Sequence, residues 1–256
     1  MRLRRIWSSV WPPLVAVILF LIIWQTATSL FHINKWTLPS PADIAHEAAA
    51  GAAGLWDHTQ ATLRLMLLGF SIGILVGLLV AFVLHYIPFL RKALYPLIIL
   101  SQNVPIIALA PLLMIWFGFG ILPKIIVITL VCFFPVAVAA MDGLSRTDRV
   151  MLDYMRMAGA SKWNIFTKLE VPYALPAIMS GAKIAATYSV MGAIIAEWIG
   201  ASKGIGYYMM LQKSSFRTDK IFVAIAIIVT ISLAMFLLIS FIEKWLIRYH
   251  PSSDDK

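Results

Sequence analysis

The sequence predicts an all-α protein that crosses a membrane about six times. Hydrophobic residues make up 61% of its 256 residues and charged residues 13%, whereas an ordinary soluble domain carries about 25% charged residues. The stretches 12–31, 65–84 and 221–242 each run for 20 residues or more without a charge. A helix of about 20 apolar residues spans the hydrocarbon core of a bilayer. We therefore expect one polytopic membrane domain over residues 1–256.

Hydrophobicity places the expected spans at about 11–31, 62–86, 93–117, 121–141, 175–199 and 221–246. The first apolar run follows a basic start, as in a signal peptide, but the bulky sequence TSLFHINKW stands where a cleavage site would need small residues. We expect this run to be a retained first span. Residues 38–60 begin with a Pro-Ser turn and predict a separate helix from Asp43, lying on the outer interface.

Lys and Arg residues predict the orientation of the spans. With six spans, thirteen of these residues fall on the side of the two termini and seven on the other, while Lys183 lies within a span. Cytoplasmic loops carry the excess of positive charge. Both termini and the long loop 142–174 are therefore predicted to be cytoplasmic.

The sequence offers no catalytic or cofactor-binding arrangement. Its net charge of +9 follows from basic residues at membrane edges and does not need a nucleic acid to explain it. The one cysteine, Cys132, has no partner for an intrachain disulfide, and no glycine-rich phosphate loop, metal-ligand cluster or nucleophile elbow is present. We expect no enzymatic activity, no metal and no cofactor on this chain.

A polar island at 142–172 separates two apolar regions and holds nine of the 33 charged residues. Residues 150–158 predict a helix that Gly159 interrupts, because Gly costs about 1 kcal/mol in a helix interior. A second short helix should follow and end before Pro172. Met and Tyr side chains at such a corner favour a buried contact with another protein, and an amphipathic helix on the membrane surface is the alternative. The apolar side chains expected on this face are Met151, Tyr154, Met155 and Met157.

Three polar residues inside spans are candidates for a solute pathway or gate. The amides of Gln102 and Asn103 could bind a solute or serve as hydrogen-bonding links between helices. Glu197 could be a gate near the outer face, or it could sit at the interface beside Trp198. The Lys183 stem is expected to reach back to the cytoplasmic interface.

Proline and glycine patterns add two expectations. The third and fourth spans hold five prolines, which kink helices and favour a role in lining a pathway. The second span carries Gly69, Gly73 and Gly77 at a spacing of four residues. Small residues with this period let helices approach closely, so they predict packing rather than a substrate site.

The island resembles the coupling loop of binding-protein-dependent ABC importer permeases. That loop reads EAA, three residues, Gly, nine residues and I-x-L-P, and this chain matches the spacing with Asp153-Tyr154-Met155, Gly159 and Leu169-x-Val171-Pro172. It departs from the pattern in its first triplet, DYM for EAA, and has Leu and Val in place of Ile and Leu.

Other segments resemble the nitrate, sulfonate and taurine branch of that family: LPSP at 38–41, PIIALAP at 105–111 leading to WFG, Ala196-Glu197, and the turn GIG at 204–206. SQNVP at 101–105 and FGFG at 117–120 look most similar to permeases for the pyrimidine precursor of thiamine. The solute could equally be a sulfonate, taurine or nitrate-like anion.

The resemblance implies a type I importer permease fold in a bacterial inner membrane. It implies a second permease chain, a cytoplasmic ATPase dimer that holds ATP and Mg²⁺, and an extracytoplasmic substrate-binding protein. Transport would proceed by alternating access, with coupling helices seated on the ATPase. The resemblance implies that the contact residues are Asp153, Tyr154, Met155, Met157, Ala158, Gly159, Ala160 and Trp163. Two other hypotheses are a stand-alone secondary transporter, which predicts paired charges within spans and a repeated half, and a membrane scaffold subunit with no transport role.

Overall fold

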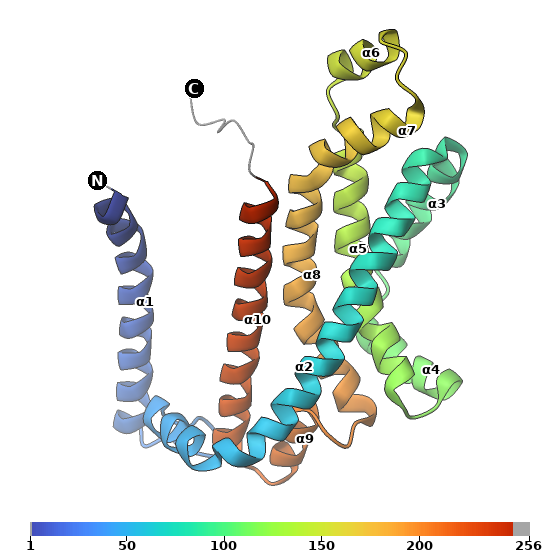
Figure 1. Ribbon diagram of the computed structural model, residues 1–256. Coiled ribbons are helices and arrows are strands. Elements are labelled where there is room, and N and C mark those ends of the chain that lie inside the picture. The colour runs from blue at the N-terminus through green and yellow to red at the C-terminus, as the bar shows by residue number, and fades with distance from the viewer. Residues whose placement is uncertain (1, 248–256) are drawn as a thin grey trace.

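The computed structural model describes the backbone of residues 2–247 and the side chains of residues 11–51 and 54–247. The described chain is helical, with short connections between its elements (Figure 1). In order, the elements are α1 (Arg2–Leu30), α2 (Pro41–Tyr86), α3 (Pro88–Ser101), α4 (Ile106–Phe117), α5 (Ile121–Ser145), α6 (Arg149–Met157), α7 (Lys162–Ile165), the π turn η1 (Phe166–Glu170), α8 (Val171–Gly200), α9 (Ile205–Ser214) and α10 (Thr218–Leu246).

The core of the bundle is α5, which packs against both α2 and α8. The three glycines of α2 explain the close approach to α5. A Cβ added at Gly69 would lie 2.6 Å from the Ile128 side chain, and one at Gly73 would lie 2.5 Å from the Cys132 Cβ. The predicted packing role of these small residues is confirmed.

Within the described residues, five helices are long and apolar enough to cross a membrane, and the count becomes six if the pair α3 and α4 is taken as one broken span. The expected span 93–117 is therefore wrong as a single helix. The chain bends by 101° between α3 and α4. Pro105, the residue before α4, cannot donate a backbone hydrogen bond. The connection at 102–105 consequently breaks the helix.

Two expected helix boundaries are also wrong. Residues 41–86 form one continuous helix, so the segment after Asp43 is not a separate interfacial helix. In Figure 1 the first part of α2 runs along the lower end of the bundle, and the rest of α2 crosses the bundle toward the top. Likewise α7, η1 and α8 follow one another without a break, because Pro172 occupies the first turn of α8, where a missing N–H is tolerated.

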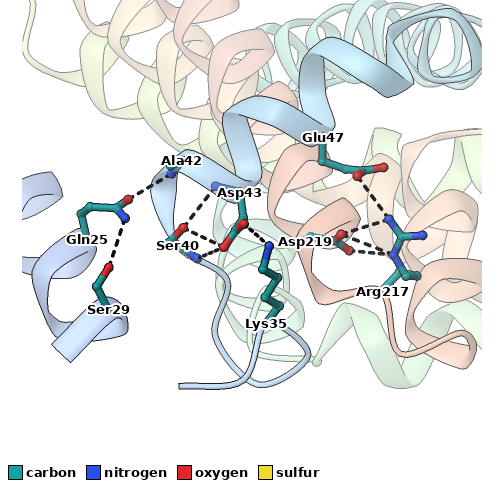
Figure 2. Close-up of polar contacts among 9 residues, drawn as sticks. All are labelled: Gln25, Ser29, Lys35, Ser40, Ala42, Asp43, Glu47, Arg217 and Asp219. Carbon is teal, nitrogen blue, oxygen red and sulfur yellow. Dashed lines mark hydrogen bonds and ion pairs between the residues drawn. The ribbon is translucent and has the colours of Figure 1, made fainter. Parts of the chain in front are cut away.

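The first turn of α1, the last turn of α10 and the segment α6–α7 lie at one end of the bundle, at the top of Figure 1. The opposite end is held together by polar contacts, which Figure 2 shows. Ser40 caps α2 by accepting from the Asp43 N–H, and Lys35 pairs with the Asp43 carboxylate. Arg217 pairs with both Glu47 and Asp219, which joins the start of α2 to the start of α10.

Candidate functional site: an exposed elbow and a cavity at a broken helix

The elbow, residues 148–163, is a helix–glycine–helix corner, as predicted. The Asp148 side chain caps α6 by accepting from the Val150 N–H. At the other end Gly159 has φ of +76°, a left-handed conformation that favours glycine. Two backbone bonds close this turn, from Gly159 N–H to the Arg156 carbonyl and from Ala160 N–H to the Met155 carbonyl. The corner is thus a well-formed local structure.

The tip of the elbow exposes large apolar side chains. Met157 is 82% exposed, Tyr154 66% and Trp163 62%. Asp153, Ala158 and Gly159 are also exposed, while Met155 and Ala160 are half-buried. The structure therefore brings the eight predicted contact residues onto one corner, at the end of the bundle that also holds the start of α1 (Figure 1).

The base of the elbow is anchored to the bundle. Phe166 is 7% exposed and packs edge-on against Phe82 of α2, with ring centroids 5.4 Å apart. His85, near the end of α2, lies 3.0 Å from the Glu170 carboxylate. A displacement of the exposed tip would therefore be transmitted to α2 through the contacts of Phe166 and Glu170, and to α8 because η1 continues into that helix. Sequence reasoning missed the His85–Glu170 pair, because the two residues are 85 positions apart.

A cavity of about 560 Å³ lies where the third span is broken. The connection 102–105 forms one wall, and α5 and α8 form the others. Gln102 and Asn103 both line this cavity, and so do Pro105 and Pro135. Two of the five prolines that the sequence singled out thus border the same cavity as Gln102 and Asn103, whose pathway role stays a prediction.

Two further polar residues line the cavity that the sequence did not single out. Tyr188 of α8 is 45% exposed and borders it from one side. Asp142, near the end of α5, borders it at the elbow end and pairs with Arg146 at 2.7 Å. Their approach depends on how α5 and α8 pack, which one-dimensional spacing does not reveal.

Glu197 lies elsewhere, in a buried polar network at the opposite end from the elbow. It is 2% exposed and accepts a hydrogen bond from the Thr62 hydroxyl at 2.8 Å. Its other oxygen accepts from the Gly206 N–H at 2.7 Å, and the Thr62 hydroxyl accepts from the Ile205 N–H at 2.8 Å. The Glu197 carboxylate and the Thr62 hydroxyl together satisfy the first two N–H groups of α9.

The structure does not bring Glu197 together with Gln102 and Asn103. It also corrects the alternative placement of Glu197 at the interface beside Trp198, because the carboxylate is enclosed by α2 and α9. Lys183 pairs at 2.8 Å with Glu243, which lies near the end of α10. Both pairings join helices that are far apart in the sequence.

Comparison with known proteins identifies the family. The family described as "Binding-protein-dependent transport system inner membrane component" matches residues 73–248. The chain belongs to this family. It is a multi-pass permease subunit of the ABC importer class, and the resemblance given by the coupling-loop spacing is confirmed.

Three relatives cover nearly the whole chain. A "Probable ABC transporter permease protein" of Haemophilus influenzae is 36% identical over 92% of this chain and 95% of its own length. The formylaminopyrimidine transport permease ThiX of Halalkalibacterium halodurans is 32% identical over 96% and 98%. The taurine transport permease TauC of Escherichia coli is 30% identical over 90% and 86%. These relatives agree with the predicted nitrate, sulfonate and taurine branch.

One solved structure supports the fold. A chain in the crystal structure of an amino acid ABC transporter with histidines matches with a TM-score of 0.60 and 18% identity, covering 73% of this chain and 92% of that chain. The predicted all-α importer permease fold is confirmed. A stand-alone carrier is not supported: the Lys183–Glu243 pair is the kind of charge pair that hypothesis predicts, but the family decides against it.

Proposed function

We propose that a separate ATPase drives this permease by seating on the elbow. The observation that carries the proposal is the exposure of Met157, Tyr154 and Trp163 on a corner whose base is fixed to α2 and α8. Water-exposed apolar side chains gathered in this way favour a protein contact. ATP and Mg²⁺ would be held by the ATPase, so this chain would need no cofactor of its own.

Two features support a cytoplasmic position for the elbow. In the sequence, six spans assign thirteen Lys and Arg residues to the side of the elbow and seven to the other, and cytoplasmic loops carry the excess of positive charge. The start of α1 and the end of α10 lie at the same end as the elbow (Figure 1). Both termini would then be cytoplasmic, and the substrate-binding protein would dock at the opposite end, where α9 lies.

The membrane face of the chain supports a second copy as partner. Many large apolar side chains on α1 and α10 are more than half exposed, among them Phe20, Ile23 and Phe241. In a membrane such faces contact either lipid or another helix. A homodimer surrounded by lipid would cover them and would place two elbows on two ATPase subunits.

The solute would be a small organic molecule that crosses by alternating access, past Gln102 and Asn103 in the cavity at the broken helix. The cargo named for the relatives, a formylaminopyrimidine for one and taurine for another, indicates two chemical classes. A thiamine pyrimidine precursor and a sulfonate, taurine or nitrate-like anion are therefore both candidates.

Replacing Gly159 with Trp tests the coupling. We expect the variant to reach the membrane in normal amounts but to lose ATP-driven uptake and the solute-dependent stimulation of ATP hydrolysis. The measurement uses proteoliposomes that contain the permease, its ATPase and its binding protein. Met157→Ser should act in the same direction, and Met157→Leu, which keeps a large apolar side chain at this exposed position, is the matched control.

Two outcomes would contradict the proposal. Normal uptake by the Gly159→Trp variant would remove the elbow from the coupling path. Uptake by vesicles that contain the permease without any ATPase would instead favour a stand-alone carrier, and absence of solute dependence in every preparation would favour a scaffold.

A further inference from the structure

The cavity at the broken helix differs from an anion site in the charges around it. Its described lining contains the amides of Gln102 and Asn103, the Tyr188 hydroxyl and the Asp142 carboxylate, and no Lys, Arg or His side chain. The nearby Arg146 is paired with Asp142. Binding an anion away from water without a cationic partner is unfavourable. The side chains therefore disfavour a sulfonate-like solute.

The backbone at the break is balanced in charge as well. The carboxyl end of α3 and the amino end of α4 meet across residues 102–105. A helix carries about half a negative charge at its carboxyl end and about half a positive charge at its amino end, so these partial charges offset one another here. The break offers both carbonyl acceptors and N–H donors, and it lacks the net positive field that an anion requires.

The free polar groups of the wall suit a neutral ligand. The Asn103 amide nitrogen is already engaged, because it donates to the Ile99 and Leu100 carbonyls. Among the described residues, neither the Gln102 amide nor the Tyr188 hydroxyl takes part in a hydrogen bond. An amide and a phenol each both donate and accept. These two groups can therefore pair with a solute that carries donors and acceptors on one edge.

The remaining wall is apolar and includes aromatic rings. Phe134 of α5 and the Tyr188 ring border the cavity, together with the polarisable Met191 side chain. Flat aromatic faces and thioethers favour contact with another flat ring. The volume of about 560 Å³ falls within the usual range of small-molecule sites, about 300–1,000 Å³.

We propose that this cavity is the transit site for an uncharged, planar heteroaromatic solute with hydrogen-bond donors and acceptors at its rim, and not for a sulfonate-like anion. The inference rests on the proposed import function and names its substrate class. Gln102 and Tyr188 hold the polar edge of the ring, while Phe134 and Met191 contact its face. The Asp142–Arg146 pair at the elbow end adds no net charge to that mouth of the cavity.

Binding to the permease alone tests this proposal without any ATPase. The full-length chain in lipid nanodiscs is titrated with cytosine, a neutral planar ring at pH 7.5, and with ethanesulfonate, and binding is followed by saturation-transfer NMR. We expect saturation of cytosine and none of ethanesulfonate. Gln102→Leu and Tyr188→Phe should each raise the Kd for cytosine by about fivefold, the effect of losing one net hydrogen bond.

Two further variants sharpen the experiment. Tyr95→Phe is the matched control, because Tyr95 packs against the core cluster near Phe166, outside the cavity lining. It should leave the Kd for cytosine unchanged. Gln102→Arg adds a cation to the wall, so it should weaken cytosine binding and create binding of ethanesulfonate.

Three results would overturn the assignment. They are saturation of ethanesulfonate by the unmodified chain, absence of cytosine saturation, and cytosine binding that neither Gln102→Leu nor Tyr188→Phe weakens. None of them depends on the elbow. If ATP-driven uptake of a sulfonate were found alongside any of them, the import function would stand and only the substrate class would be wrong.

Discussion

Gly159 and Gly204 both adopt left-handed backbone conformations, with φ of +76° and +122°, but their surroundings are opposite. A Cβ added at Gly159 would meet nothing within 4 Å, whereas one at Gly204 would lie 2.2 Å from the Glu197 carboxyl carbon. Gly159 therefore only turns the chain, and Gly204 also makes room for a buried charge. The same residue type serves an open corner at one end and a closed network at the other.

The two ends of the molecule differ in the same way, in which kind of side chain each exposes or buries. At the elbow, apolar side chains such as Met157 are exposed although water does not favour them. At the other end, Glu197 is buried although a carboxylate favours water, and the Thr62 and Gly206 donors compensate it. Changes at the buried end should therefore alter stability, and changes at the exposed end should alter coupling to a partner.

The largest expected effect is that of Gly204→Ala. The left-handed backbone costs an L-residue about 1–2 kcal/mol, and displacement of the Glu197 carboxylate breaks a buried polar network, so we expect a total loss of about 4 kcal/mol. Thermal unfolding of the purified chain in detergent measures it. Gly54→Ala is the control, because a Cβ there meets nothing within 4 Å and Ala favours the helix. Equal stability of the two variants would contradict the account of a closed network.

Glu197→Ala should follow, with a loss of about 3 kcal/mol, because the Gly206 N–H and the Thr62 hydroxyl lose their acceptor. Glu197→Gln keeps one acceptor oxygen and should lose less. The same unfolding measurement compares the two. If Glu197→Ala were as stable as the unmodified chain but failed in uptake, the residue would belong to the pathway after all.

Gly159→Ala should cost only about 1 kcal/mol, from backbone strain alone, because open space surrounds the position. This variant is the direct counterpart of Gly204→Ala. Unfolding gives the stability difference between them, and co-purification with the ATPase gives the coupling. A stability loss as large as that at Gly204 would show that the elbow is packed against the chain and not open to a partner.

The smallest expected effect concerns pH. The Lys35 ammonium, through its hydrogen bond, and the Ser40 hydroxyl hold the pKa of the Asp43 carboxyl below its usual value. A lowered folded-state pKa gives stability above the unfolded value, about 3.9, and that stability is lost as the pH falls through the folded pKa. Asp43→Asn should thus unfold with a weaker dependence on pH below about 4 than the unmodified chain. Identical acid profiles would show that the Lys35–Asp43 pair does not stabilise the end of the bundle opposite the elbow.

Much of the fold could be predicted from the sequence, because long apolar runs and their flanking charges act locally. The corner at Gly159 was predicted for the same reason, since a glycine inside a helical pattern acts on its own neighbours. The break near Pro105 was indicated by proline content, but its angle was not. A bend of 101° depends on what α3 and α4 each pack against.

The candidate site was only half predictable. Gln102 and Asn103 stood out as polar residues in an apolar span. Asp142 did not, because charged residues near span ends are common. Tyr188 did not, because it lies in the middle of a span and the sequence does not show which neighbour it faces. The surroundings of Glu197 were also out of reach. Its hydrogen-bond partner Thr62 lies 135 residues away, and the sequence contains no local signal that joins them.

The sequence by itself determined that the chain is a helical membrane protein with one exposed helical corner and that its spacing matches a permease family. Hydrophobicity, charge bias and glycine conformation act over a few residues, so they can be read along the chain. Only the tertiary structure decided which polar groups line a cavity and which are buried in a hydrogen-bonded network. Those outcomes depend on helices that pack together although they lie tens of residues apart in the sequence. The close approach of the Glu197 carboxyl group to Gly204 is one such contact, and it distinguishes a structural carboxylate from a functional one.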